Sequence, residues 1–290
     1  MKLVSIPANP VPEDVVTGAI QTPDGVNLRF ARWAPPPGRK GTVLVLQGRA
    51  EFIEKYFETV RDLRARGFAV VTFDWRGQGL SDHALSNRHK GYVRSFSDYI
   101  TDLEAAMEQV VLPDCPPPIF ALAHSMGGAV VIRACHDGSR WFERVVLSAP
   151  MIALPPGRLI QVAGPLARLM RLMGIGGAYV PHGDAAVTGT ENFVGNVLTS
   201  DPVRYARNAA VLEQEPNLGL GAPTVAWADG ALRQMKQFAD PGYAASIRQP
   251  ILMVAAGRDE VVSTPAIETF GQTLLAGRHL ILAGAKHEIL

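Results

Sequence analysis

Six short apolar runs, rich in β-branched residues, recur along the chain and alternate with stretches of helical periodicity. A sheet that is buried on both faces requires nearly continuous apolar strands, and alternation with helices is typical of a parallel sheet covered by helices. We therefore expect an α/β fold with a mostly parallel central sheet and helices on both faces. The runs are residues 42–48, 69–75, 119–125, 144–150, 251–257 and 279–285.

Other local patterns complete this predicted framework. Residues 54–67 place apolar side chains on one helical face and end at a glycine, and residues 95–111 begin with a Ser-x-x-Asp pattern that is close to a helix capping box. Residues 19–33 instead predict an antiparallel hairpin that turns at Asp24-Gly25. The hairpin would precede the first parallel strand.

The strand pattern disappears between residues 151 and 240, a segment that is rich in Gly and Pro and has helical patches. We expect this segment to form a helical cap inserted between two strands, over the carboxyl ends where open α/β sheets bind ligands. The predicted division is a core of residues 1–150 and 241–290 and a cap of residues 151–240. A chain of 290 residues is long enough for both parts.

Charge and cysteine content narrow the range of partners. The formal net charge is +1 without a basic block, which argues against nucleic acid, and two cysteines are too few for a disulfide framework or a metal cluster. The N-terminal segment lacks a signal-peptide pattern, and no apolar stretch reaches the roughly 20 residues that span a bilayer. We expect a soluble cytoplasmic protein, at most peripheral to the inner face of the membrane.

A single serine interrupts the apolar stretch from residue 120 to residue 132. A strand followed at once by a helix requires a tight turn, so the residues two positions to either side of its apex must be small. Ala123 and Gly127 meet this requirement around Ser125. The pattern A-x-S-x-G is close to the G-x-S-x-G nucleophile elbow, although the pentapeptide alone also fits a serine that caps a helix.

Two further residues fit the partners that a nucleophilic serine needs. A serine hydroxyl requires a general base and an acid that orients this base, and in such folds the acid and then the histidine follow the serine along the chain. Asp259 follows the run 251–257, and His287 follows the run 279–285. We therefore predict Ser125 as nucleophile, His287 as base and Asp259 as orienting acid, all at one edge of the sheet.

Five motifs together resemble the α/β-hydrolase superfamily and, within it, the branch of monoacylglycerol lipases and lysophospholipase L2, which is also grouped with serine aminopeptidases. The resemblance implies an α/β-hydrolase fold with a helical cap and a serine hydrolase that needs no cofactor. The motifs are LQGRAEF (46–52), FDWRGQGLSD (73–82), AHSMGG (123–128), GRDEVV (257–262) and GAKHE (284–288).

The resemblance also implies an oxyanion hole built from backbone N–H groups. This branch usually reads His-Gly-x-x-Glu where the present chain reads Gln47-Gly48-Arg49-Ala50-Glu51. The implied donors are the N–H groups of Arg49 and Met126. Because backbone donors do not depend on side-chain type, the change of His to Gln concerns the rigidity of the loop more than the chemistry.

The implied substrate is an ester of a single-chain lipid, a monoacylglycerol or a lysophospholipid, cleaved through an acyl-enzyme. The apolar, Met-rich cap suits an acyl chain. One cap stretch, residues 158–174, predicts an amphipathic helix, and we favour a helix packed on the core over a lid that touches lipid. Its apolar face would hold Leu159, Val162, Leu166, Leu169 and Met173, with Arg158, Arg168 and Arg171 largely elsewhere.

Two other functional classes fit the same motifs. One is a small-molecule esterase or a peptidase, in which Glu191, Glu213 or Glu215 of the cap could bind a substrate amine. The other is a non-catalytic binding protein with a hydrolase fold.

Two short patterns suggest cofactors but are incomplete. Gly77-x-Gly79 lacks the third glycine of a dinucleotide fingerprint, and His287-Glu288 is not followed by the second histidine of a zinc-protease motif. We therefore expect neither a cofactor nor a metal. In the family a helix follows the catalytic histidine, whereas three residues follow it here, and we expect an exposed apolar patch on one sheet face.

Overall fold

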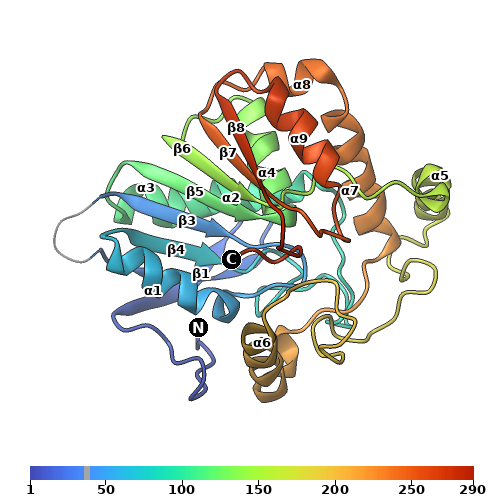
Figure 1. Ribbon diagram of the computed structural model, residues 1–290. Helices are drawn as coiled ribbons and strands as arrows, with labels where there is room; N and C mark the ends of the chain where they lie inside the picture. The colour runs from blue at the N-terminus through green and yellow to red at the C-terminus, as the bar shows by residue number, and fades with distance from the viewer. Residues whose placement is uncertain (36–39) are drawn as a thin grey trace.

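The computed structural model describes residues 1–35 and 40–290, apart from the side chains of residues 158–162. Eight strands form one twisted sheet in the order β1-β2-β4-β3-β5-β6-β7-β8, as Figure 1 shows. β2 pairs antiparallel with β1 and β4, and every other pairing is parallel. The strands are β1 (Val15–Gln21), β2 (Asn27–Trp33), β3 (Thr42–Leu46), β4 (Ala69–Phe73), β5 (Ile119–His124), β6 (Arg144–Ser148), β7 (Ile251–Ala256) and β8 (Gly277–Leu282).

This sheet confirms the predicted α/β framework. Five of the six apolar runs each contain one parallel strand, the run 279–285 overlaps β8, and β1 and β2 form the predicted hairpin. The hairpin turns at Gly25, whose φ of 83° lies in the left-handed region that favours glycine. The strand β8 begins two residues earlier than the run 279–285 because Gly277 and Arg278 still pair with β7.

Helices cover the sheet on both faces, as predicted. The expected helix over 54–67 divides into a 3-10 turn and an α-helix, and the one over 95–111 continues as a π-helix. The latter begins only at Asp98, whose carboxylate accepts a hydrogen bond from the Ser95 N–H. These elements are η1 (Ile53–Tyr56), α1 (Phe57–Ala65), α2 (Asp98–Ala106), η2 (Met107–Val111), α3 (Leu112–Asp114), α4 (Ser125–His136), α8 (Pro241–Ala245) and α9 (Thr264–Thr273).

Alternate residues of the parallel strands bury on opposite faces of the sheet, as the period of a strand requires. On one face, Ala121 of β5 and Met253 of β7 pack with buried residues of α2, α4 and α9 in the main core. On the other face, Val43 and Val45 of β3 pack with η1 and α1. The edge strand β8 leaves Leu280, Ile281 and Leu282 exposed.

The segment between β6 and β7 contains the remaining helices and lies beyond the carboxyl ends of the parallel strands (Figure 1). It comprises α5 (Arg158–Leu172), α6 (Pro202–Gln214), η3 (Pro216–Leu218) and α7 (Val225–Phe238). In the part of the chain that the structure describes, no helix has the length and apolar character needed to cross a membrane.

The expected packing of α5 on the core is wrong for the residues whose side chains are described. Leu166, Leu169 and Met173 are exposed, so this apolar face turns towards solvent. The helix is held instead by Arg171, whose guanidinium donates to Asp229 Oδ2 of α7 at 2.7 Å. The predicted positions Arg158, Leu159 and Val162 lie outside the described side chains.

A buried ion cluster joins β2 of the hairpin to η1 and to the end of β4. Arg29 of β2 donates to both oxygens of Glu54 in η1 at 2.8 Å and to Asp74 Oδ2, just after β4, at 2.7 Å. All three side chains are fully buried. Asp74 Oδ1 also accepts the Ile53 N–H at 3.0 Å. The cluster therefore fixes η1 against the end of β4.

We expect Arg29→Met to lower the free energy of unfolding by about 3–5 kcal/mol, because two buried carboxylates would lose their cation. Urea denaturation of the purified chain measures this change. The matched control is Arg64→Met, which breaks an ion pair with the exposed Asp14 and should cost about 0–1 kcal/mol. Equal effects of the two substitutions would contradict this role of the cluster.

Candidate active site

The tight turn predicted around Ser125 is present. β5 ends at His124 and α4 begins at Ser125, whose φ of 47° lies in the sterically strained left-handed region. A Cβ atom on Gly127 would lie 2.6 Å from the carbonyl oxygens of Leu46 and Gln47, so only glycine fits there. The turn presents the serine hydroxyl at the carboxyl edge of the sheet.

The structure brings all three predicted triad residues together. His287 Nε2 lies 3.0 Å from Ser125 Oγ, and His287 Nδ1 lies 2.8 Å from Asp259 Oδ2. The other Asp259 oxygen accepts the N–H groups of Val261 and Val262 at 2.8 and 2.9 Å. These distances are those of a nucleophile, a base and an orienting acid.

The environment of Asp259 keeps its carboxylate ionised. Burial by itself would raise the pKa of Asp259, but the hydrogen bond and the charge of His287 together with the Val261 and Val262 N–H groups hold this pKa below its ordinary value. An ionised Asp259 fixes the tautomer in which the Nδ1 of His287 carries its proton and Nε2 faces the serine.

The loop predicted to form the oxyanion hole is fixed on both sides of Arg49. The Gly48 N–H donates to Glu51 Oε2 at 2.5 Å, and the Ala50 N–H donates to Gln78 Oε1 at 2.6 Å. The Arg49 N–H between them has no acceptor among the described residues. Met126 is the second residue of α4, where helical N–H groups lack intrahelical partners. Both predicted donors are thus available for an oxyanion.

The buried carboxylate of Glu51, which the sequence motif contains but to which the sequence assigned no role, organises this loop. Besides the Gly48 N–H, Glu51 accepts hydrogen bonds from Tyr56 Oη at 2.6 Å and from Lys55 Nζ at 2.7 Å. Lys55 also binds Glu288, the residue after His287, at 2.5 Å. Burial alone would raise the pKa of Glu51, but the charge and hydrogen bond of Lys55, together with His124 and the Tyr56 hydroxyl, lower this pKa to about 2. The pair Glu51–Lys55 therefore links the oxyanion loop to the histidine loop.

His124 completes the polar surroundings of the triad. Its Nδ1 lies 3.1 Å from the Ser148 carbonyl oxygen, and its ring centroid lies 4.7 Å from that of His287. Burial lowers the pKa of His124 to about 4, despite the carboxylate of Glu51 3.6 Å from its Nε2. His124 is therefore neutral near pH 7 and adds no positive charge beside His287.

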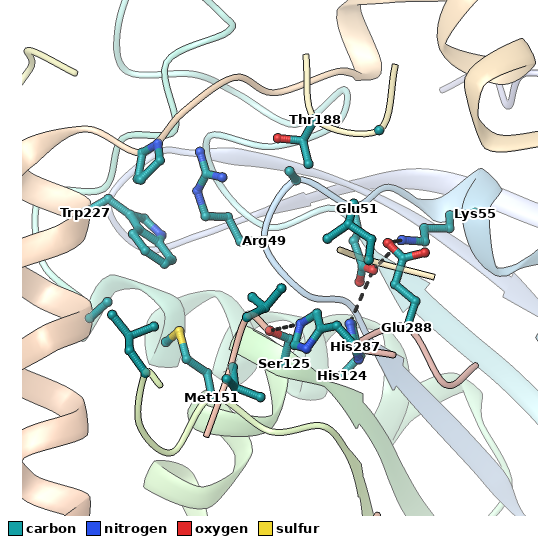
Figure 2. Close-up of a pocket in the computed structure, with 18 of the residues that line it drawn as sticks. Arg49, Glu51, Lys55, His124, Ser125, Met151, Thr188, Trp227, His287 and Glu288 are labelled. Carbon is teal, nitrogen blue, oxygen red and sulfur yellow. Dashed lines mark hydrogen bonds and ion pairs between the residues drawn. The ribbon is translucent and has the colours of Figure 1, made fainter. Parts of the chain in front are cut away.

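The hydroxyl of Ser125 faces a cavity of about 410 Å³ between the sheet edge and the cap. Figure 2 shows the Ser125–His287 pair on one side of this cavity and Arg49 and Trp227 on the other. The indole ring of Trp227 is part of the wall of this cavity. Apolar side chains form much of the wall, namely Met151, Leu154, Leu198, Leu212, Trp227, Ala231, Leu232, Met235, Val261 and Val262.

The acidic residues considered for binding an amine lie outside this cavity. Glu191, Glu213 and Glu215 are not among the residues that line it. The carboxylates that do line it are Glu51 and Glu288, and both are paired with Lys55. Within residues 1–35 and 40–290, no group of three or more His, Cys, Asp and Glu side chains is placed to hold a metal ion.

We expect Glu51→Ala to lower kcat about 10- to 100-fold, because the oxyanion loop would lose the acceptor of the Gly48 N–H; one oxyanion donor alone is worth about 10²–10³. Glu51→Gln should recover part of this loss, since its amide oxygen can accept the same bond. Steady-state kinetics on a p-nitrophenyl ester measures both variants. As control, Glu104→Ala removes an exposed carboxylate of α2 that does not line the cavity. A kcat unchanged in Glu51→Ala would contradict the positioning role.

Comparisons with known proteins agree with this geometry. A family model described as "Serine aminopeptidase, S33" matches residues 37–290. The chain is 32% identical over 280 residues to lysophospholipase L2 of Escherichia coli strain K12, which covers 92% of this chain and 79% of the relative.

Solved structures share the fold at lower identity. A monoacylglycerol lipase of Paleococcus ferrophilus gives a TM-score of 0.68 at 21% identity, covering 90% of this chain and 91% of that chain. A soluble variant of the Saccharomyces cerevisiae monoglyceride lipase, in complex with a substrate analog, gives 0.69 at 20% identity, covering 95% and 88%. The resemblance drawn from the five motifs is confirmed, and the chain belongs to the serine aminopeptidase S33 family of α/β-hydrolases.

Proposed function

We propose that the protein is a serine hydrolase that cleaves carboxylic esters of single-chain lipids, monoacylglycerols or lysophospholipids. One observation carries this proposal: Ser125 Oγ, 3.0 Å from His287 Nε2, faces a cavity whose wall is largely apolar. The names of its relatives, lysophospholipase L2 and monoacylglycerol lipase, point to the same substrate class. In this proposal residues 151–240 act as the cap and the remaining parts as the catalytic core.

The proposed mechanism follows from the arrangement of the triad. Ser125 Oγ attacks the ester carbonyl while His287 Nε2 accepts its proton, and Asp259 stabilises the imidazolium that forms. The N–H groups of Arg49 and Met126 bind the oxyanion of the tetrahedral intermediate. His287 then protonates the leaving alcohol, which leaves an acyl-enzyme on Ser125. In the second half of the reaction, His287 accepts a proton from a water molecule, whose oxygen attacks the acyl carbon. His287 then returns the proton to Ser125 Oγ, and the fatty acid is released.

The charges of the cavity favour an ester over a peptide with a free amine. A peptidase that recognises an amino terminus needs a carboxylate free to pair with it. Glu51 and Glu288 line the cavity, but both are already paired with Lys55. The apolar wall formed in part by Leu232 and Met235 instead suits an acyl chain.

The proposed setting is the cytoplasm, with peripheral contact between the cap and the membrane. Both cysteines are free thiols, which supports a reducing compartment. The α5 segment exposes Leu166, Leu169, Leu172 and Met173, a larger apolar surface than isolated surface leucines would give. Such a face can enter the boundary between head groups and acyl chains, where the substrates reside.

Fluorophosphonate labelling tests the proposed chemistry directly. We expect one adduct per chain, located on Ser125 by mass spectrometry, and none on Ser125→Ala. Asp259→Asn should still fold but react and turn over about 10³–10⁴-fold more slowly, because His287 would lose its orienting carboxylate. Heat-unfolded protein serves as the control for nonspecific labelling. A folded chain without the Ser125 adduct would refute the serine-hydrolase function and favour a binding role.

Membrane contact through α5 has a separate test. The double variant Leu169→Glu and Leu172→Glu should bind phospholipid vesicles at least about 10-fold more weakly in a flotation assay, since each substitution places a charge on the apolar face. Its hydrolysis of a short water-soluble ester should stay within about twofold of the wild type. Leu112→Glu, at an exposed leucine of α3, is the matched control. Undiminished vesicle binding of the double variant would refute contact through α5.

A further inference from the structure

Arg49 is a cavity-lining cation without an acidic partner. None of the carboxylates in the described parts of the chain lies within 4.0 Å of its guanidinium, whereas the other cavity-lining cation, Lys55, is paired with two. Its Nη2 donates to the Gly221 carbonyl oxygen, while its buried Nε has no acceptor. The guanidinium carbon lies 5.3 Å from the centre of the Trp227 ring.

The contacts of the Arg49 guanidinium offset only part of the free-energy cost of burying its charge. Withdrawing a cation from water costs free energy unless an anion or full hydrogen bonding compensates. Here desolvation dominates and lowers the pKa of the Arg49 guanidinium to about 10, because only the tyrosines Tyr99 and Tyr179 oppose it weakly. Arg29, in contrast, is held by two buried carboxylates. An anionic ligand in the cavity would supply the negative charge that the described residues do not place beside Arg49.

The position of Arg49 relates this missing anion to the substrate. Its backbone N–H is a proposed oxyanion donor, so its side chain starts where the ester carbonyl would bind. Figure 2 shows the side chain extending from this point along the cavity wall, beside Trp227. In a lysophospholipid, only the glycerol backbone and its ester oxygens separate the ester carbonyl from the phosphorus atom. The span of an arginine side chain is of the same order.

We propose that the Arg49 guanidinium binds the phosphate of the substrate's head group and thereby makes lysophospholipids better substrates than uncharged monoacylglycerols. This inference rests on the proposed lipid-ester function and specifies its substrate class. The planar fork of guanidinium donors matches phosphate oxygens, and only Nη2 of Arg49 donates to an acceptor among the described residues. Lys55 cannot replace it, because Glu51 and Glu288 occupy its ammonium group.

A purely structural role for Arg49 makes a different prediction. Its bond to the Gly221 carbonyl and its contact with Trp227 tie the oxyanion loop to the cap. If this tie were its only role, removing the side chain would affect every ester alike. The ratio of kcat/KM for two acyl-matched substrates therefore separates phosphate binding from support of the loop.

The experiment compares 1-palmitoyl lysophosphatidylcholine with 1-palmitoylglycerol. The first has no net charge, so a preference for it reports on the phosphate and not on overall charge. In Arg49→Met the ratio of the two kcat/KM values should fall about 10- to 100-fold, mainly through a higher KM for the lysophospholipid, as expected for a lost charge-assisted hydrogen bond. Arg49→Lys should be intermediate. Arg233→Met removes a paired, half-exposed cation of α7 and should leave the ratio unchanged.

Each outcome decides the proposal. An equal loss on both substrates in Arg49→Met, with a lower melting temperature, would overturn phosphate binding and leave only the structural role. A third outcome combines two results: inorganic phosphate inhibits monoacylglycerol hydrolysis by the wild type, and Arg49→Met does not change the substrate ratio. The site would then bind free phosphate and not the head group, which would also overturn the proposal. A wild-type enzyme that labels at Ser125 but cleaves neither lipid would refute the proposed lipid function itself, which is a distinguishable failure.

Discussion

The strained turn at Ser125 is the constraint on which the rest of the site depends. A φ of 47° costs a residue other than glycine about 1–3 kcal/mol, and the turn persists only because its surroundings permit no alternative. β5 is hydrogen-bonded on both sides, to β3 and to β6, and most of α4 is buried. Gly127 lets α4 approach the end of β3, where the oxyanion loop begins. The same close approach therefore positions both the nucleophile and the loop that faces it.

The elements that were predictable from the sequence are those whose signals are local or ordered along the chain. Apolar runs predict buried strands because burial on both faces leaves no polar position. The proximity of Ser125, Asp259 and His287 was predictable because each follows a strand, and parallel strands end at one edge of the sheet. Once the strands are assigned, the proximity of these residues follows from topology.

Other features depend on partners that are remote in sequence. Lys55 could be matched with Glu51 by its spacing of four residues, but Glu288 joins them only through the fold. Arg49 lacks an acidic partner among the described residues because of how the surrounding elements pack, and a sequence motif does not record that packing. The predicted packing of α5 was wrong because an amphipathic pattern identifies an apolar face but does not show whether protein or lipid covers that face.

The helices between β6 and β7 are attached unevenly to the rest of the molecule. α6 is linked to α1 by the bonds from Arg204 and Arg207 to Glu58, at 2.6 Å each, and α7 contributes buried residues to the main core. α5 packs on α7 and is held there by the ion pair between Arg171 and Asp229. The wall of the cavity is thus formed largely by α6 and α7, which are bonded to or packed in the core, whereas α5 packs on α7 and exposes Leu166, Leu169 and Leu172.

Charge is distributed in the cavity with a similar asymmetry. On the side of His287, two carboxylates pair with the Lys55 cation. Lys55 therefore does not act as an unpaired cation beside the imidazolium that His287 forms during the reaction. On the side of Trp227, Arg49 has no carboxylate within 4.0 Å among the described residues. An uncharged ester satisfies only the apolar wall and the oxyanion donors, whereas a phosphate-bearing ester also compensates the one cation that folding leaves unpaired there. A phosphate bound beside Arg49 would therefore offset part of the desolvation cost that folding imposes on this guanidinium.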